Sequence, residues 1–364
     1  MNRAHFNGLP SLRLKNYFLF FAAAGTFSIR PLFGLVNTEF SKRILNQENN
    51  EMKNTFPQLR RATLGLAALL AVSGLVQAQS YAFSVVAKNL HRPTGIAIRG
   101  DDTILFTEVP TPGVNGARGG SNAVSSLNLD SGKITTLHMG EPEPVNLALG
   151  QGRSFYWTCK SAGVILEQAN DGTTSVFLGG LKKPSGVAVD RDGTVFFTQI
   201  PTPGVNGANG GSNSVSMSDG TTTAVLHIGE PEPTDITVAR NGDLYWTCKT
   251  AGVILEQTAA GVTTVFAKQL NKPAGIIVDR QNRHLYFTEV PTPGVSGANG
   301  GSNKIWEIDL KTGAKTLVHA GDPEPTDITV ARNGNLYWTC SSAGVIVEAK
   351  RKGERKEDGD NDRD

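Results

Sequence analysis

The chain has 364 residues, enough for one large domain or two ordinary ones. Its formal net charge of +2 argues against a nucleic-acid partner, because such partners select strongly basic surfaces. The 41 glycines and the low aromatic content of 7% are typical of a turn-rich all-β protein and not of a helical one.

The region before residue 80 predicts export. The segment "MKNTFPQLRRATLGLAALLAVSGLVQAQS" starts at Met52 and combines basic residues, an apolar stretch and a small-residue cleavage pattern ending at Ala78. We interpret 52–78 as a secretory signal peptide and 1–51 as a disordered upstream over-extension of the reading frame. The alternative is an uncleaved anchor, since about 17 apolar residues are at the short limit for spanning a membrane. We therefore expect a secreted or periplasmic protein without stable membrane insertion after cleavage.

Three phrases recur along the chain at a spacing of about 90 residues. They are "TEVPTPGVNGARGGSN" (107–122, then 198–213 and 288–303), "LHMGEPEP" (137–144, then 226–233 and 318–325) and "FYWTCKSAGVILEQ" (155–168, then 244–257 and 336–349). Each unit divides into two halves that contain a proline-led strand, a turn and an aromatic strand. A half of about 45 residues matches one four-stranded propeller blade. Three double units therefore predict an all-β, six-bladed β-propeller.

The two ends of the repeat region predict how the ring closes. Blade six has strands near 326–331, 335–340 and 344–349, but the charged segment 350–364 replaces its outer strand. The segment "YAFSVVAKNLHRP" (81–93) matches "GVTTVFAKQLNKP" (261–273), the predicted outer strand of blade four. We expect Phe83–Ala87 to complete blade six, which hides the open edges of the ring. The propeller then spans 79–349 as a monomer, and 350–364 forms a disordered tail.

The phrases "PSGVAVD" (184–190) and "PAGIIVD" (273–279) resemble NHL repeats and the SMP-30/gluconolactonase-like six-bladed propellers of the TolB-like superfamily. In gluconolactonase-like members, the resemblance implies one divalent metal on the axis with Glu, Asn and Asp ligands. The positions that correspond to a typical Asn ligand carry Thr94, Val145, Ser185, Thr234, Ala274 and Thr326. None of these is a good metal ligand, so the metal site does not carry over residue by residue.

Acidic and amide residues nevertheless recur where inner strands begin. The predicted mouth of the propeller contains Glu143, Asn146, Glu232, Asp235, Glu324 and Asp327 of the even blades, together with Glu108, Gln199 and Glu289, which end second strands of the odd blades. Like charges at close quarters either bind a cation or hold a proton. The metal hypothesis places a divalent cation such as Ca²⁺ on Glu143, Asp235 and Asp327. The alternative is a solvated rim in which Asp235 and Asp327 cap turns.

Asparagines in the glycine-rich loops suggest a second calcium hypothesis, in which the oxygens come from Asn115, Asn122, Asn206, Asn213 and Asn303. These loops lack the carboxylates from which calcium sites usually draw their affinity.

Threefold placement predicts that Cys159, Cys248 and Cys340 are free thiols, because they lie too far apart for disulfides. We interpret Trp157, Trp246 and Trp338 as interblade core. For His138, His227 and His319 we favour a packing or turn role over a pairing of each with its nearby acid.

No nucleophile-elbow, phosphate-loop or zinc-spacing signature is present in the sequence. Three nearly identical sites favour recognition, because catalysis generally needs one asymmetric constellation. The sequence therefore predicts a secreted binding module for a small molecule, a carbohydrate or a protein at the mouth. The alternatives are a metal-dependent hydrolase of lactonase type with substituted ligands and a protein-interaction scaffold, so the sequence leaves enzymatic activity open.

Overall fold

The computed structural model describes residues 81–110, 121–201, 203, 212–291 and 303–352. Within these ranges the chain forms 24 strands in six four-stranded antiparallel sheets, which confirms the predicted all-β six-bladed propeller. None of the described residues belongs to a helix that is both apolar and long enough to cross a membrane. The predicted signal peptide, the over-extension and most of the tail lie outside the described residues and stay predictions.

Each blade runs from an inner strand to an outer strand. The odd blades are β2 Pro93–Arg99, β3 Thr103–Glu108, β4 Ala123–Asn128 and β5 Ile134–Met139 (blade one); β10 Pro184–Val189, β11 Val195–Gln199, β12 Ser214–Ser218 and β13 Thr223–Ile228 (blade three); and β18 Pro273–Val278, β19 His284–Glu289, β20 Lys304–Asp309 and β21 Lys315–Ala320 (blade five). The even blades are β6 Pro144–Leu149, β7 Phe155–Cys159, β8 Val164–Gln168 and β9 Thr174–Leu178 (blade two); β14 Pro233–Val238, β15 Leu244–Cys248, β16 Val253–Gln257 and β17 Thr263–Ala267 (blade four); and β22 Pro325–Val330, β23 Leu336–Cys340, β24 Val345–Arg351 and β1 Tyr81–Ala87 (blade six).

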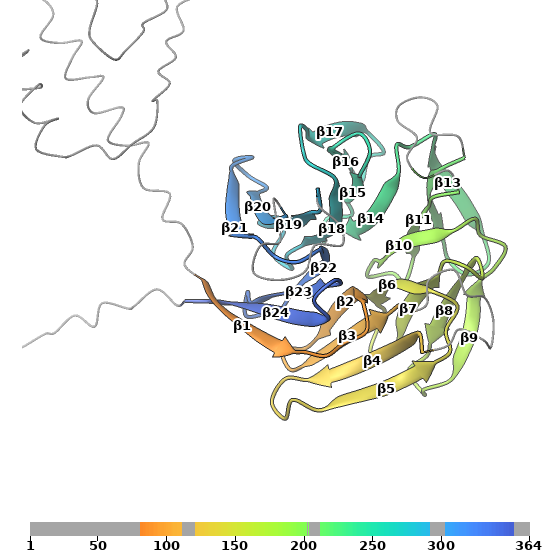
Figure 1. Cartoon of the computed structure of the whole chain (residues 1–364). Coiled ribbons are helices and arrows are strands. Elements are labelled where there is room, and N and C mark those ends of the chain that lie inside the picture. The colour runs from red at the N-terminus through yellow and green to blue at the C-terminus, as the bar shows by residue number, and fades with distance from the viewer. Residues whose placement is uncertain (1–80, 111–120, 202, 204–211, 292–302, 353–364) are drawn as a thin grey trace, which may run out of the picture. The chain divides into compact units, whose positions relative to one another are not determined.

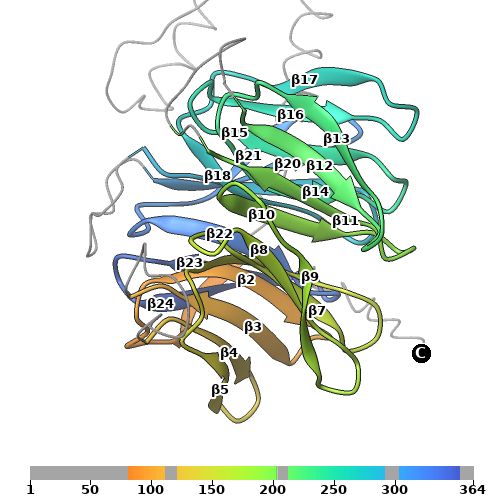
Figure 2. The same cartoon turned by 90° about the vertical axis from the view of Figure 1, so that its right-hand side faces the viewer.

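The six inner strands surround a central axis. Contacts run from β2 to β6, β10, β14, β18 and β22 and then back to β2, which closes the ring (Figure 1; Figure 2). Between blades, apolar side chains of facing sheets form separate cores. Trp157 of blade two packs with Leu105 and Val124 of blade one, and Trp246 and Trp338 occupy the same place two and four blades on. These tryptophans are fully buried, which confirms their predicted interblade role.

The first described strand completes the last blade, as predicted. β1 pairs with β24 in a register that joins Phe83 to Ala349 and Ala87 to Ile346 (Figure 1). Directly after β1, the Leu90 N–H donates to the Gly344 carbonyl over 2.9 Å. Leu181 and Leu270 make the same bond to Gly163 and Gly252 at 2.8 and 2.9 Å. The segment from Tyr81 to Leu90 therefore takes the place that the outer strand and the turn after it take in blades two and four.

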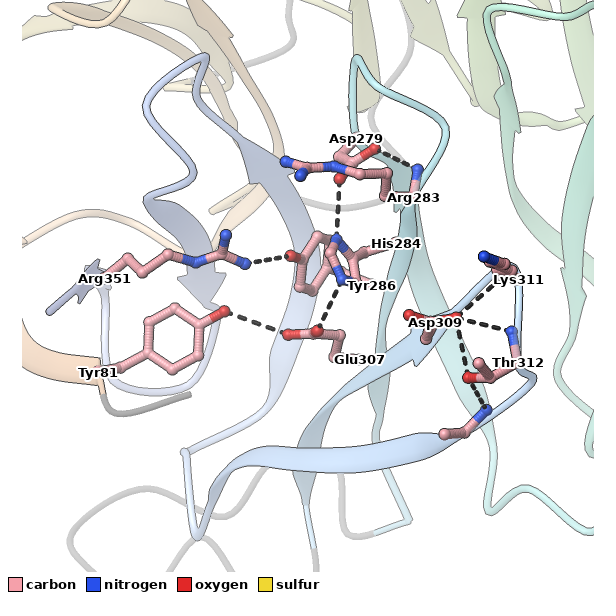
Figure 3. A network of polar contacts seen from close by, with 11 residues as sticks. Tyr81, Asp279, Arg283, His284, Tyr286, Glu307, Asp309, Lys311, Thr312 and Arg351 are labelled. Carbon is pink, nitrogen blue, oxygen red and sulfur yellow. Dashed lines mark hydrogen bonds and ion pairs between the residues drawn. The ribbon is translucent and has the colours of Figure 1, made fainter. Parts of the chain in front are cut away.

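The propeller extends two residues further than predicted, because β24 continues to Arg351 instead of ending at Ala349. The charged composition suggested a disordered tail from residue 350 onward, and this prediction is wrong for its first two residues. The Arg351 N–H donates to Asn335 Oδ1 (3.2 Å), and its guanidinium donates to the Tyr286 hydroxyl (3.3 Å). Arg351 stays in the strand because Asn335 of its own blade and Tyr286 of blade five supply polar partners (Figure 3).

A buried polar network joins the closing strand to blade five (Figure 3). His284 lies between two carboxylates, with Nδ1 3.0 Å from Asp279 Oδ2 and Nε2 3.4 Å from Glu307 Oε1. Tyr81 of β1 donates its hydroxyl to Glu307 Oε2 over 3.2 Å. Burial opposes ionisation of Asp279, but hydrogen bonds from His284 and the Arg283 N–H hold its pKa below the ordinary value. The network thereby joins β1 to blade five, in addition to the ladder that β1 forms with β24.

The closure can be tested within β1 by two alanines of opposite exposure. Ala87 is buried against Ile96 and Ile346, whereas Ala82 is exposed. Ala87→Glu would place an uncompensated carboxylate in the core between blades six and one, so we expect it to lower the free energy of unfolding by about 3 kcal/mol or more. Ala82→Glu should change it by less than about 0.5 kcal/mol. Urea denaturation of both variants measures the difference, and equal effects would contradict the closure.

Candidate functional site: a polar constriction in the central channel

Three predicted mouth residues meet on the axis of the propeller. Asn146, Asp235 and Asp327 are the third residues of β6, β14 and β22, and they are 8%, 5% and 5% exposed. Asn146 Nδ2 donates to Asp327 Oδ2 over 3.2 Å, and Asp235 and Asp327 lie close enough for each carboxyl group to shift the pKa of the other. We call these three residues the axial triad.

The axial triad divides the central channel. Above it, a cavity of about 260 Å³ opens where the inner strands begin, and we call this the mouth cavity. Below it, an inner cavity of about 270 Å³ has mostly aliphatic walls from all six inner strands. All three triad residues line both cavities, so their side chains form the floor of one and the ceiling of the other.

Glycines make room for the triad. The third residue of each odd inner strand is Gly95, Gly186 or Gly275. A Cβ at Gly186 would lie 2.6 Å from the Asp235 Cα, and a Cβ at Gly275 would lie 2.5 Å from the Asp327 Cα. Real Cβ atoms essentially never approach backbone this closely. The alternation of glycine with Asn or Asp around the ring is therefore a packing requirement.

Backbone N–H groups hold the triad carboxylates. Asp235 accepts from the N–H of Ile236 in its own strand (2.8 Å) and from that of Ile276 in blade five (2.9 Å). Asp327 likewise accepts from Ile328 (2.7 Å) and, across the ring closure, from Ile96 of blade one (2.9 Å). Asn146 Oδ1 accepts from the Val187 N–H of blade three (3.0 Å). Each triad residue thus ties its even blade to the next odd blade.

The two triad carboxyl groups retain protons at unusually high pH. Burial raises the pKa of Asp235 to about 7, although the N–H groups of Ile276 and Ile236 favour its charged form. Burial also raises the pKa of Asp327 well above its ordinary value, and the neighbouring Asp235 charge raises it further. Of the two behaviours expected for clustered acids, the observed geometry favours the holding of a proton.

The glutamates before the even inner strands do not reach the triad. Glu143, Glu232 and Glu324 have left-handed backbones, with φ of 57°, 58° and 55°. Their carboxylates accept hydrogen bonds from Ser161, Thr250 and Ser342 in the loop between the second and third strands of the same blade. Of the three, Glu324 lines the mouth cavity. These residues hold the rim together, and the sequence period alone did not show that their carboxylates bind local hydroxyl groups instead of meeting on the axis.

The predicted residues of the odd blades also serve as anchors. Their side chains accept the N–H of the residue two before the inner-strand proline: Glu108 from His91, Gln199 from Lys182 and Glu289 from Asn271, at 2.8, 2.7 and 2.8 Å. Glu289 Oε2 also accepts the Trp306 indole N–H at 2.7 Å. These bonds fix the turns that enter the inner strands and keep all three side chains away from the triad.

Among the described residues, no three His, Cys, Asp or Glu side chains are placed to share a metal ion. The predicted ligands Glu143, Asp235 and Asp327 are accordingly not brought together as a set. Of the loop asparagines, Asn122, Asn213 and Asn303 are fully buried and donate through Nδ2 to the backbone carbonyls of Glu141, Glu230 and Asp322, which follow them in the chain, at 3.1, 3.1 and 3.0 Å. Asn115 and Asn206 lie outside the described residues.

A second polar cluster, which the sequence analysis missed, repeats in the even blades. In blade two, Glu141 Oε2 accepts from Trp157 Nε1 (3.1 Å) and Cys159 Sγ (3.5 Å), while His138 stacks on Trp157. Glu230 makes the same two bonds in blade four. The signal was available, because the first glutamate of "GEPEP" recurs at a fixed distance from Trp and Cys.

The thiols in this cluster are chemically quiet. Cys159, Cys248 and Cys340 are buried and free, as predicted. Burial raises the pKa of each thiol, and the adjacent Glu141, Glu230 or Asp322 charge raises it further. Because the thiolate is the nucleophilic form, these groups are poor nucleophiles at neutral pH.

Blade six leaves this cluster incomplete. Asp322 replaces the glutamate, and its Oδ2 lies 2.6 Å from His319 Nδ1. The side chain is one methylene shorter, and the buried Trp338 Nε1 has no hydrogen-bond partner among the described residues. For the histidines, the pairing that we ranked second occurs at His319 and, at 3.9 Å, between His227 and Glu230. His138 instead binds Gln168 at 2.8 Å.

We predict that Asp322→Glu stabilises the protein. The longer side chain should reach Trp338 Nε1, and satisfying a buried donor increases the free energy of unfolding by about 1 kcal/mol. The reverse change in blade four, Glu230→Asp, should leave the Trp246 indole N–H without its acceptor and lower the free energy of unfolding by a similar amount. Chemical denaturation of both variants tests this pair; a destabilised Asp322→Glu protein would show that the missing methylene is not the cause.

The triad predicts a falling pH–stability profile. An unfolded aspartate titrates near pH 4, whereas Asp235 in the folded protein titrates near pH 7, so the folded state binds the extra proton between these values. Stability conferred by that proton is complete below about pH 4 and is lost as pH rises to 7, by roughly 4 kcal/mol. Asp235→Asn should flatten this decline, because the asparagine at position 146 already occupies the equivalent place.

The matched change in the opposite direction is Asn146→Asp, which adds a third buried carboxyl group. We expect it to steepen the loss of stability with rising pH, since three carboxyls then compete for the same protons. Urea denaturation at several values between pH 4 and 8 measures both slopes. Parallel profiles for wild type and both variants would mean that the triad does not bind the proton.

Comparisons with known proteins bear on the fold. No protein-family model and no curated protein matches the sequence. Among solved structures, similar ones include streptogramin B lyase (TM-score 0.54, 18% identity, 76% of this chain and 100% of that chain), a putative gluconolactonase (0.54, 13%, 74% and 92%) and the calcium-binding protein regucalcin of Agrobacterium tumefaciens (0.57, 13%, 75% and 96%). At these identities the likeness shows a shared fold and does not extend to activity.

Proposed function

We propose that the protein is an exported binding module whose mouth cavity receives one small, hydroxyl-rich ligand such as a sugar unit. The observation that carries this proposal is the chemistry of the cavity wall. Hydroxyl side chains of Thr94, Ser185, Thr234 and Thr326 line it, above a floor made by the axial triad. About 260 Å³ suits a single small molecule, since ligand pockets usually start near 300 Å³.

The wall presents hydrogen-bond acceptors. Ser185 Oγ donates to the Thr234 carbonyl (2.8 Å), Thr234 Oγ1 donates to the Glu232 carbonyl (3.2 Å), and Thr326 Oγ1 donates to the Thr94 carbonyl (3.3 Å). With their protons engaged, these oxygens offer lone pairs to the cavity. Lys160 and Lys249 line the same cavity and supply donors. A sugar hydroxyl both donates and accepts, so it matches this mixed lining.

Recognition fits the geometry better than catalysis does. The triad carboxylates are committed to backbone N–H groups, and the thiols are buried with raised pKa values. His138 stacks on Trp157, and His227 packs against Trp246 in a tilted arrangement. The expectation of export, to the periplasm or outside the cell, derives from the signal-like segment 52–78 and is part of the proposal.

The test is ligand-observed NMR with a panel of hexoses, pentoses and amino sugars. We expect at least one sugar to bind, and Thr234→Phe to abolish the signal because the ring fills the mouth cavity. The control is Thr223→Phe on the exposed outer strand β13, which should bind as wild type does. Binding that survives Thr234→Phe, or the absence of binding to every sugar, would overturn the proposal.

Hydrolysis of a panel of lactones, measured with and without chelator, distinguishes the binding module from the main alternative, a metal-dependent hydrolase. Chelator-sensitive lactone hydrolysis would favour the hydrolase hypothesis instead, and it would require ligands beyond those that the described residues place together.

A further inference from the structure

The far end of the channel has a different chemistry from the mouth. There the turns between first and second strands surround an opening of about 710 Å³, which shares four aliphatic residues and Arg280 with the inner cavity. Five arginines from five blades line this opening: Arg99, Arg191, Arg240, Arg280 and Arg332. We call it the arginine opening.

The repeat places these arginines around the ring. In blades three to six, each arginine is the second residue after the inner strand, within the turns "DRDG", "ARNG", "DRQN" and "ARNG". Arg99 lies one position earlier, as the last residue of β2. Blade two has Gln151 at the shared position. Because the inner strands converge on the axis, residues that look like isolated turn cations in the sequence face one common opening.

Hydrogen bonds between neighbouring turns make the rim rigid. Arg99 donates to the Arg153 carbonyl and Gln151 donates to the Arg191 carbonyl, both over 2.7 Å. Asn282 Oδ1 accepts the N–H of Arg240 at 2.8 Å. Asp101 Oδ1 accepts the N–H of Arg332 at 2.9 Å. Four of the six junctions between adjacent blades are thereby tied, and the guanidinium groups project from a preorganised frame.

The positive charge of the opening is only partly compensated, since five arginines line it with two acids. Within the described part of the chain, none of the five guanidinium groups forms an ion pair with a carboxylate. Two acids also line the opening, but Asp190 accepts from two N–H groups of its own turn and Asp279 binds His284. Burial and the adjacent Arg153 charge lower the pKa of Arg99. Like charges gathered without partners cost stability, and a bound anion would offset that cost.

We propose that the arginine opening binds one compact anion that carries several phosphate groups. Guanidinium groups form paired hydrogen bonds with phosphate oxygens, and a ring from five blades lets several of them reach the same ligand. The opening has a volume of about 710 Å³, which is large enough for a compact multivalent anion. This site lies beyond the axial triad from the mouth cavity, so the inference is independent of the sugar-binding proposal.

Calorimetric titration with inorganic triphosphate at low ionic strength tests the proposal. We expect saturable binding at one site per chain that weakens as salt is added, because ion pairs at an exposed rim are screened. Orthophosphate should bind at least about tenfold more weakly, since it reaches fewer guanidinium groups. Citrate is the arm that separates phosphate from carboxylate recognition, and tighter binding of citrate than of triphosphate would reject the phosphate assignment.

Two arginines of one turn provide a matched pair of variants. Arg280 lines the opening, whereas Arg283, three residues later, does not. We expect Arg280→Ser to weaken triphosphate binding by about tenfold and Arg283→Ser to leave it within about twofold. Gln151→Arg completes the ring and should tighten binding several-fold. Unfolding measured for each variant shows that these changes do not act through loss of the fold, because removing a repelling charge should not destabilise the protein.

Three results would overturn the proposal. One is the absence of saturable triphosphate binding at low salt. Another is an equal loss of affinity in Arg280→Ser and Arg283→Ser, which would indicate a general effect of net charge. The third is binding of a short single-stranded oligonucleotide as tightly as triphosphate, since a compact site should exclude an extended polyanion. The mouth variant Thr234→Phe should retain full triphosphate binding.

Discussion

The propeller depends on one interaction, the clamp that a triad side chain forms between neighbouring blades. Asp327 illustrates it: its backbone occupies the space left by Gly275 in blade five, and its carboxylate accepts the Ile96 N–H of blade one. A residue in this role needs a glycine before it and a free N–H after it. Neither neighbour can itself be a clamp, because its own position must be glycine. The two-blade period of the sequence therefore follows from packing at the axis.

The clamp also determines what the channel can do. Because Asp235 and Asp327 are buried beside each other, ionising both carboxyl groups costs free energy. The folded protein therefore retains a proton at this pair. The same side chains separate the mouth cavity from the inner cavity. A stabilising element thus partitions the axis into two compartments, one lined by hydroxyl groups and one ending in arginines. Loading one compartment need not involve the other.

The fold could be predicted from the sequence because the chain repeats its strand pattern. The match between 81–93 and 261–273 predicted that β1 pairs with β24, as the structure shows. The sites could be predicted only partly. Of the nine predicted mouth residues, Asn146, Asp235 and Asp327 converge, whereas Glu143 and Glu289 turn to local partners. Strand period gives the position of a residue but not the direction of a side chain at a left-handed backbone. The sequence did not predict the arginine opening, because charged residues in turns usually face solvent. These arginines come together only when the ring closes.

The axial triad departs from the threefold repeat at a position where three identical residues would lack a hydrogen-bond donor. Three aspartates on the axis would present only acceptors to one another, apart from the protons they retain. Asn146 breaks this symmetry, because its amide donates to Asp327 while its oxygen still accepts the Val187 N–H. Blade two thereby lacks the buried acid of the other even blades, and with Gln151 it also lacks their arginine. Blade two therefore departs from the other even blades at both ends of the inner cavity, at the axial triad and at the arginine opening.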